Sequence, residues 1–227
     1  CLVIGGAWLA WLIGAEKGLA LGVTPFILGA VLKSALAAAL LMALARRKLN
    51  RQSTPAPVLQ DGEASRRLLA ALPFKLTDAQ ARAIEEIRHD LKSGEQMARL
   101  LQGDVGSGKT AVAAVVLADA ASSGFQSALM APTEILARQH YEKLAPMLEE
   151  AGISSILLTG RDTPAVKRKK AAAIAAGEVQ VAIGTHALFQ DAVSFHNLAL
   201  AVIDEQHRFG VRQRQQLQDK GRDGVHL

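Results

Sequence analysis

The sequence predicts an α/β protein in which helices cover both faces of a parallel sheet, preceded by an apolar helical segment. Short apolar runs alternate with helical patterns from residue 73 to the end. A glycine-rich turn at residues 103–110 joins one of these runs to a helix. By contrast, residues 1–45 carry only Glu16, Lys17 and Lys33 as charged side chains. We therefore expect two parts of different character.

Composition limits the classes of protein to consider. Half of the 227 residues are apolar, enough for a core in one large domain or two small ones. Cys1 is the single cysteine, which excludes a disulfide framework and a cysteine-rich metal site and fits a reducing compartment. The net charge of +5 falls within residues 1–72, so it does not indicate DNA binding by the remainder. A first residue other than Met indicates a piece of a longer protein.

The first part, residues 1–48, is predicted to be a hydrophobic helical segment. Its run at 24–45 is long enough to cross a bilayer, and the basic run at 46–51 is typical of the cytoplasmic flank. A signal peptide is disfavoured because the basic and apolar regions stand in the reverse order. A buried helical hairpin of a soluble protein is the alternative. We expect membrane anchoring through residues 1–45 and a cytoplasmic location for residues 49–227.

Residues 49–65 contain prolines and polar residues and are predicted to be a linker, followed by a domain over 66–227. A short helix within 65–74 should stop at Pro73. The next helix, over 77–92, follows Thr77 as N-cap and places Ile84, Ile87 and Leu91 at helical spacing. Five strands are expected, with helical stretches between them: 98–103, 127–132, 154–160, 180–185 and 198–205.

The turn after the first of these strands matches the phosphate-binding pattern G-x-x-x-x-G-K-[ST]. Backbone N–H groups of such a loop surround phosphates, and the helix that begins at Lys109 adds its positive dipole end. Lys109 would reach the β- and γ-phosphates, and the hydroxyl of Thr110 would bind magnesium. The predicted nucleotide-binding loop comprises Gly103, Asp104, Val105, Gly106, Ser107, Gly108, Lys109 and Thr110.

A pair of carboxylates ends the last predicted strand. Asp204 and Glu205 follow the apolar run at 198–203, at the strand end where ligands of parallel sheets collect. Asp204 would hold the magnesium ion, and Glu205 would polarise the attacking water. A solvated acidic pair is the usual explanation of such residues alone, but the phosphate loop upstream favours the metal site. ATP and Mg²⁺ are therefore the expected cofactors, with Lys109, Asp204 and Glu205 as catalytic residues.

Residues 66–227 also resemble a known family. The segments "LPFKLTDAQ", "LLQGDVGSGKT", "LMAPTEILARQH", "LLTG", "GTHALFQDAVSFHNLALAVIDEQHRFGVRQR" and "GRDGVHL" are similar to the first motor lobe of RecG-type helicases of superfamily 2. The resemblance implies a RecA-like lobe that binds ATP and forked or branched DNA, in an enzyme that couples ATP hydrolysis to DNA translocation and fork remodelling. It places Phe74, Thr77 and Gln80 at the adenine.

The same resemblance implies a DNA-backbone track and a coupling pair, Gln206 and His207. The DNA track would comprise Pro132, Thr133, Glu134, Thr159, Gly160, Gly184, Thr185 and His186. Loops at strand ends with Thr, Gly and His can bind phosphates without reading base sequence. Thr133 has a second explanation as a helix N-cap. The basic run at 166–173 is interpreted as a solvated helix face, with contact to DNA as the alternative. His186 and His207 have no partner at metal-ligand spacing and are interpreted as hydrogen-bonding switches.

The apolar segment resembles a different family. "LALGVTPFILGAVLKSALAAALL" is similar to the last membrane segments of the BioY family, the substrate-binding component of biotin uptake transporters. That family has Gly-Asp-x-x-Lys where this chain has Gly29 to Lys33 without the aspartate. Lys33 is then either a former ligand contact or a snorkelling lysine. A membrane component of a biotin transporter is the alternative function. An ATP-binding transporter subunit is disfavoured because no LSGGQ-like signature occurs.

The helicase resemblance also implies what this chain needs from elsewhere. A superfamily 2 motor closes ATP between two lobes, and the second lobe supplies an arginine worth roughly 10³ to 10⁵ in rate. No such lobe follows within these 227 residues. We therefore expect nucleotide binding with very weak hydrolysis and no unwinding by this chain alone.

Overall fold

The computed structural model describes residues 11, 33–42, 55–104, 106–190, 192–205, 220–221 and 224–227. The chain divides into two compact units, Cys1–Gln52 and Ser53–Leu227. In the first unit residues 33–42 form a helix whose large apolar side chains, such as Leu36 and Leu41, are exposed. Among the described residues, no helix combines the length and apolar character that a bilayer crossing requires. Most of the predicted 1–48 segment lies outside the described residues.

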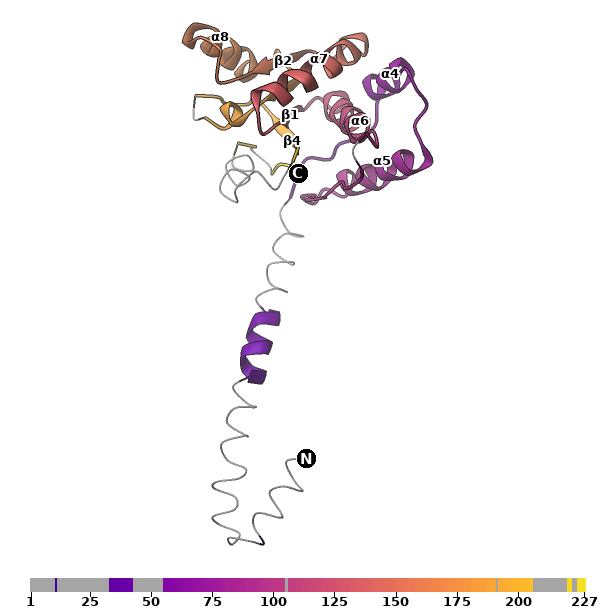
Figure 1. Ribbon diagram of the computed structural model, residues 1–227, viewed down its shortest axis with the longest axis vertical. Coiled ribbons are helices and arrows are strands. Elements are labelled where there is room, and N and C mark those ends of the chain that lie inside the picture. The colour runs from indigo at the N-terminus through magenta and orange to yellow at the C-terminus, as the bar shows by residue number, and fades with distance from the viewer. Residues whose placement is uncertain are drawn as a thin grey trace. The chain divides into compact units, whose positions relative to one another are not determined.

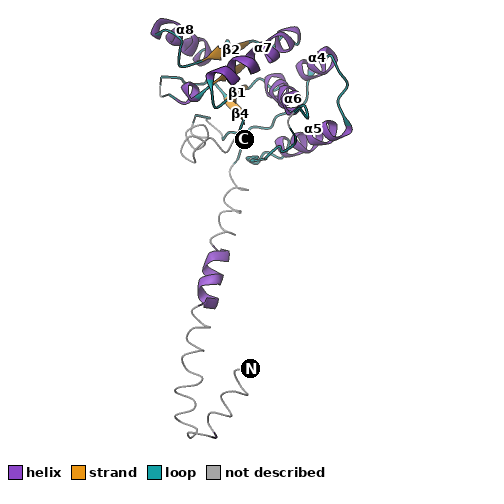
Figure 2. Ribbon diagram, viewed as in Figure 1, coloured by secondary structure: helices purple, strands orange, loops and turns teal. Residues whose placement is uncertain are grey.

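The second unit is built on a sheet of four parallel strands. They are β1 (Gln126–Met130), β2 (Ser155–Leu158), β3 (Val181–Gly184) and β4 (Leu198–Ile203), in the order β2-β3-β1-β4 (Figures 1 and 2). Met130 lies beside both Gly184 and Ile203, and Leu158 lies beside Gly184. The carboxyl ends of all four strands are therefore level, and the loops that follow them meet at one edge of the sheet.

Helices cover both faces of this sheet, as the sequence predicts. The helices are α4 (Glu63–Ala71), α5 (Asp78–Leu91), α6 (Lys109–Ser122), α7 (Glu134–Glu150) and α8 (Pro164–Ala175), with the short 3₁₀ helix η1 (His186–Phe189). Leu129 and Ile183 point into one core with side chains of α4 to α7. Ala128 and Ala182, on alternate positions, point into a second core with α8 and η1. Figure 1 shows α8 on the opposite side of this unit from α5.

Local signals account for where the helices begin. Thr77 caps α5: its hydroxyl accepts from the Gln80 N–H at 3.3 Å, and its own N–H donates to the Gln80 side chain at 2.9 Å. Thr133 and Thr163 cap α7 and α8 in the simpler way, through one hydroxyl each. Helix α4 ends at Ala71, two residues before Pro73.

The strand predicted at 98–103 does not form, so that prediction is wrong. Residues 98–104 have no regular secondary structure, and Leu100 is 69% exposed. Leu227 pairs with the start of this run: its N–H donates to the Met97 carbonyl and its carbonyl accepts from the Arg99 N–H. Apolar character alone is insufficient, because a strand needs a neighbour along its length.

The second half of the predicted linker packs on the domain. Ala56 and Leu59 are buried, and their N–H groups donate to the carbonyls of Gly94 and Leu91. His226 fastens the same region, because its Nδ1 accepts from the Met97 N–H at 3.1 Å and its Nε2 donates to the Pro57 carbonyl at 2.8 Å. Burial lowers the pKa of His226, which keeps the ring neutral. The described part of 49–65 is thus part of the domain's surface rather than a spacer.

Candidate nucleotide site

The glycine-rich loop leads directly into α6. Gly106 and Gly108 have φ values of +83° and +78°, a backbone region in which a Cβ is strained. Gly108 is the N-cap of α6, so Lys109 and Thr110 stand in the first turn, as the sequence predicts. The Lys109 ammonium donates to the carbonyls of Gly103 and Asp104, at 2.8 Å each. The lysine thus folds over its own loop, where a phosphate would compete with these carbonyls for it.

Gln80 connects α5 to this loop. Its side-chain amide donates to the Ser107 carbonyl at 2.8 Å, while its oxygen accepts from the Thr77 N–H. A Cβ added to Gly108 would collide with the same amide, so the close approach of Gln80 requires a glycine there. Of the three residues expected at the adenine, Gln80 therefore contacts the loop that would hold the phosphates, and Thr77 is linked to that loop through Gln80.

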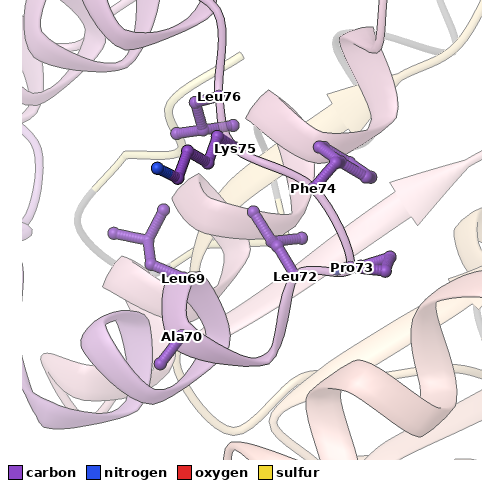
Figure 3. Close-up of a pocket in the computed structure, with 7 residues that line it drawn as sticks. All are labelled: Leu69, Ala70, Leu72, Pro73, Phe74, Lys75 and Leu76. Atoms are coloured by element: carbon purple, nitrogen blue, oxygen red, sulfur yellow. The ribbon is translucent and has the colours of Figure 1, made fainter.

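Phe74, the third of these residues, lies in the connection between α4 and α5. Its side chain is 50% exposed. The connection forms a shallow hollow (Figure 3) lined by Leu69, Ala70, Leu72, Pro73, Phe74, Lys75 and Leu76. Thr77 and Gln80 do not line this hollow.

Asp204 stands at the carboxyl end of β4. Its backbone N–H donates to the Met130 carbonyl at 2.8 Å, which holds it beside the end of β1. Its Oδ1 accepts from the Glu205 N–H at 3.0 Å, and its Oδ2 lies 2.7 Å from Nε2 of His140. The hydrogen bond from His140 lowers the pKa of Asp204, against burial, and the charge of Lys109 lowers it further. The carboxylate is therefore ionised, and the positive charge of Lys109 is one of the influences that favour this state.

His140 is a site residue that the sequence interpretation missed. It lies on α7, three residues after the buried Ala137 and four before the buried Leu144. That spacing puts it on the helix face that packs against the sheet. The signal was therefore present, as a histidine in register with the buried positions of a helix that follows a strand. Glu205, next to Asp204, is exposed and has a φ of 49°.

The first group of predicted DNA-contacting residues, Pro132 to Glu134, follows β1. Thr133 does cap α7, with its hydroxyl accepting from the Leu136 N–H at 3.3 Å. Glu134 forms an ion pair with Arg161 at 3.0 Å. This pair joins the loop after β1 to the loop after β2, although the two arrive from distant parts of the sequence.

The second group, Thr159 and Gly160, is braced from α8. The Lys167 ammonium donates to the Gly160 carbonyl at 2.7 Å, and that of Lys170 donates to the Leu157 carbonyl at 2.6 Å and to Asp162 at 3.0 Å. Asp162 in turn accepts from the Thr159 N–H at 3.0 Å. Half of the basic run thus holds this loop, which neither of the two sequence explanations anticipated. Arg168 and Lys169 are exposed.

The third group follows β3. Gly184 ends that strand so close to the Leu158 carbonyl that a Cβ would collide with it. Thr159 and Thr185 are each 2% exposed, so both residues are closed to a ligand in this conformation. His186 is exposed at the start of η1. Three predicted residues, Val105, Gln206 and His207, lie outside the described residues.

Comparison with known proteins assigns this arrangement to a family. Residues 77–223 match the model of the DEAD/DEAH box helicases, and this range contains the phosphate loop and Asp204. The chain belongs to the DEAD/DEAH box helicase family. None of the relatives and structures named below supports the resemblance of residues 1–45 to biotin transporters.

Within the DEAD/DEAH box helicases, the similarity is to one kind of enzyme. The chain is 48% identical over 183 residues to the ATP-dependent DNA helicase RecG of Aquifex aeolicus, and 52% identical over 157 residues to that of Bacillus subtilis. These alignments cover 81% and 69% of this chain but 23% of each relative. The chain therefore spans about a quarter of the length of these relatives.

Solved structures of DEAD/DEAH box helicases and their kin agree with the fold. A structure of RecG bound to a three-way DNA junction matches with a TM-score of 0.68 and 46% identity, over 74% of this chain and 23% of that one. A hypothetical ATP-dependent RNA helicase from Sulfolobus tokodaii matches with a TM-score of 0.56 at 16% identity, over 73% of this chain and 49% of that one. The second match shows the shared fold alone.

Proposed function

We propose that residues 66–227 are the ATP-binding first lobe of a RecG-type DNA helicase motor. The lobe binds ATP with Mg²⁺ between the loop at 103–110 and the end of β4. The observation that carries the proposal is that Lys109 begins α6 directly after the glycine-rich loop, while Asp204 follows β4 and bonds to the Met130 carbonyl at the end of β1. A cation suited to phosphates and an anion suited to a metal thus belong to one lobe, and the charge of Lys109 contributes to the lowered pKa of Asp204.

The roles of the individual groups follow from this arrangement. Lys109 exchanges its bonds to the Gly103 and Asp104 carbonyls for bonds to phosphate oxygens. The Thr110 hydroxyl and Asp204 hold Mg²⁺, which when bound neutralises charge on the β- and γ-phosphates. Glu205, directly after Asp204, orients the attacking water. Phe74, Thr77 and Gln80 provide the adenine side.

DNA is the proposed second ligand. The loops after β1, β2 and β3 meet at the same edge of the sheet as the nucleotide site, because the strand ends are level. They offer the exposed Gly160 and His186, while Thr159 and Thr185 are buried beneath them. Such contacts suit the sugar-phosphate backbone and carry no base specificity. Gln206 and His207 are proposed to couple nucleotide state to this track, and forked or branched DNA is the proposed substrate of the complete motor.

Nucleotide binding is the first test. Titration of the full chain with a fluorescent ATP analogue should give saturable binding that strengthens when Mg²⁺ is added. Lys109→Ala should weaken that binding at least about tenfold, since one charge-assisted phosphate contact contributes about 1.5–3 kcal/mol. Lys169→Ala, which removes an exposed lysine of α8, is the matched control and should bind like the unaltered chain. Binding that is insensitive to Lys109 would overturn the assignment.

Activity is the second test. The chain by itself should hydrolyse ATP very slowly and separate no DNA strands, because a superfamily 2 motor takes its catalytic arginine from a second lobe. Joining the chain to a second lobe of a RecG relative should restore DNA-stimulated hydrolysis. Strand separation by the purified chain alone would contradict this part of the proposal.

The proposed location of residues 49–227 is the cytoplasm. Membrane anchoring through residues 1–45 has only the composition of that segment and its basic flank in support. Alkaline extraction of cell membranes distinguishes the two cases, since an anchored chain stays with the membrane fraction and an unanchored one is released.

A further inference from the structure

His140 is held against the carboxylate that the proposed function assigns to the metal. Its Nε2 lies 2.7 Å from Oδ2 of Asp204, and its side chain is 17% exposed. An ionised carboxylate only accepts hydrogen bonds, so the imidazole donates from Nε2. The two residues are 64 positions apart in the sequence and come from different elements, α7 and the end of β4.

We propose that His140 is a positioning residue, which fixes the Asp204 carboxylate in the orientation that binds the divalent cation of the bound nucleotide. This inference rests on the proposed function. Carboxylates that bind metals are themselves commonly oriented by hydrogen bonds from outside the metal's ligand set. His140 is such a donor. Its short distance to Asp204 and its partial burial hold the hydrogen bond in one geometry.

The carboxylate is held from two sides and still has room for a metal. Oδ1 accepts from the Glu205 N–H at 3.0 Å and Oδ2 accepts from His140. Each carboxylate oxygen has a second lone pair, so both can accept one hydrogen bond and still contact a cation or its water. With both oxygens engaged, the Asp204 side chain cannot rotate away without breaking two bonds. That is the function of a positioning group rather than of a ligand.

The helix that carries His140 is well fixed. Thr133 caps its first turn, and Ala137, Leu144 and Leu148 bury the face that His140 shares. Packing of this kind limits the positions available to the imidazole, so the geometry at Asp204 is set by the core and not by a mobile loop.

The test measures binding of Mn²⁺, as the probe metal, to the full chain with saturating ATP, by electron paramagnetic resonance. His140→Phe keeps a ring of similar size but removes the donor, and His140→Ala removes the ring altogether. Each should weaken Mn²⁺ about tenfold or more, the range in which loss of such a supporting bond falls. His140→Gln, whose amide nitrogen is reached through the same number of bonds, should restore affinity to within about threefold of the unaltered chain. Gln139→Ala, on the exposed neighbour, should change nothing.

A second measurement separates positioning from general loss of structure. In an Asp204→Ala chain, which keeps no carboxylate to position, His140→Phe should cause no further loss of Mn²⁺ affinity. Circular dichroism identifies which variants fold, and His140→Gln decides the case if the other two do not. Unchanged Mn²⁺ affinity in a folded chain lacking the donor, or an equal loss with Asp204 removed, would overturn the inference while leaving nucleotide binding intact. Absence of any ATP-dependent Mn²⁺ binding by the unaltered chain would overturn the proposed function as well.

Discussion

Arg88 on α5 and Asp119 on α6 form an ion pair inside the second unit of the chain. Nε of Arg88 donates to Oδ2 of Asp119 at 2.9 Å, and the terminal nitrogen Nη2 donates to Oδ1 at 3.0 Å. The Asp119 side chain is 1% exposed and that of Arg88 12%. The hydrogen bond that Arg88 donates to Asp119 raises the pKa of Arg88, against burial. This pair ties the helix that carries Gln80 to the helix that begins at the phosphate loop.

The burial of the two partners predicts unequal costs when each is removed. Arg88→Met leaves the Asp119 carboxylate buried without a cation, which costs about 3–5 kcal/mol of folding free energy. Asp119→Asn keeps a polar group of the same size, and Arg88 keeps Glu85 at 3.5 Å and some contact with water, so about 1–3 kcal/mol is expected. In the Asp119→Asn background, Arg88→Met should cost at least about 1 kcal/mol less than in the native one.

Urea unfolding of the full chain, followed by far-ultraviolet circular dichroism, measures all four free energies. A domain's whole stability is about 5–15 kcal/mol, so Arg88→Met should shift the midpoint clearly. Two outcomes would refute the reasoning: a cost of Arg88→Met below about 1 kcal/mol, or the same cost whether or not Asp119 is charged. Either would mean that water reaches the pair despite its burial.

Three further predictions concern the loop, the fold and the DNA track. Gly108→Ala should destabilise the lobe by about 1–2 kcal/mol because of its φ of +78°, and should weaken ATP-analogue binding because the new methyl displaces Gln80; unfolding and nucleotide titrations measure the two effects. Burial lowers the pKa of His226, so the unfolded chain binds the proton more readily than the folded one. The free energy of unfolding should therefore be highest above pH 6.5, the ordinary pKa of histidine, and should fall as the pH drops below that value. Urea unfolding of His226→Gln should show a flatter pH dependence. Lys170→Met should release the Thr159–Gly160 loop and weaken binding of forked DNA several-fold, measured by fluorescence anisotropy, with ATP binding unchanged and the exposed Lys169→Met as control.

Local sequence signals were sufficient for most of the helices and for the phosphate loop. The start of α5 follows from Thr77 and Gln80, which bond each other within one turn. The start of α6 follows from glycines that supply left-handed backbone directly before Lys109. The apolar runs of β1 to β4 predicted their strands to within two residues at each end, because the sheet packs against helices on both faces.

Local sequence signals did not predict which segments pair as strands or which segments pack together. The run at 98–103 contains two adjacent leucines and predicted a strand, but among the described residues it pairs near its start with Leu227, and its strand does not form. The sequence also predicted a linker where Ala56 and Leu59 pack against the end of α5, because two buried side chains among polar residues make no periodic pattern.

The sequence by itself indicated the chemical groups of the candidate site: a cation and a hydroxyl after a glycine-rich turn, and two carboxylates after a strand. Each of these patterns lies within a few consecutive residues, so it can be recognised from local sequence without knowledge of the fold. The tertiary structure alone decided that the charge of Lys109 contributes to the lowered pKa of Asp204, that His140 bonds to that carboxylate, and that lysines of α8 brace the loop at Thr159 and Gly160. Each of these contacts joins residues from separate elements. The residues come close because the strands of the parallel sheet end at the same edge and because the helices bury particular faces against that sheet.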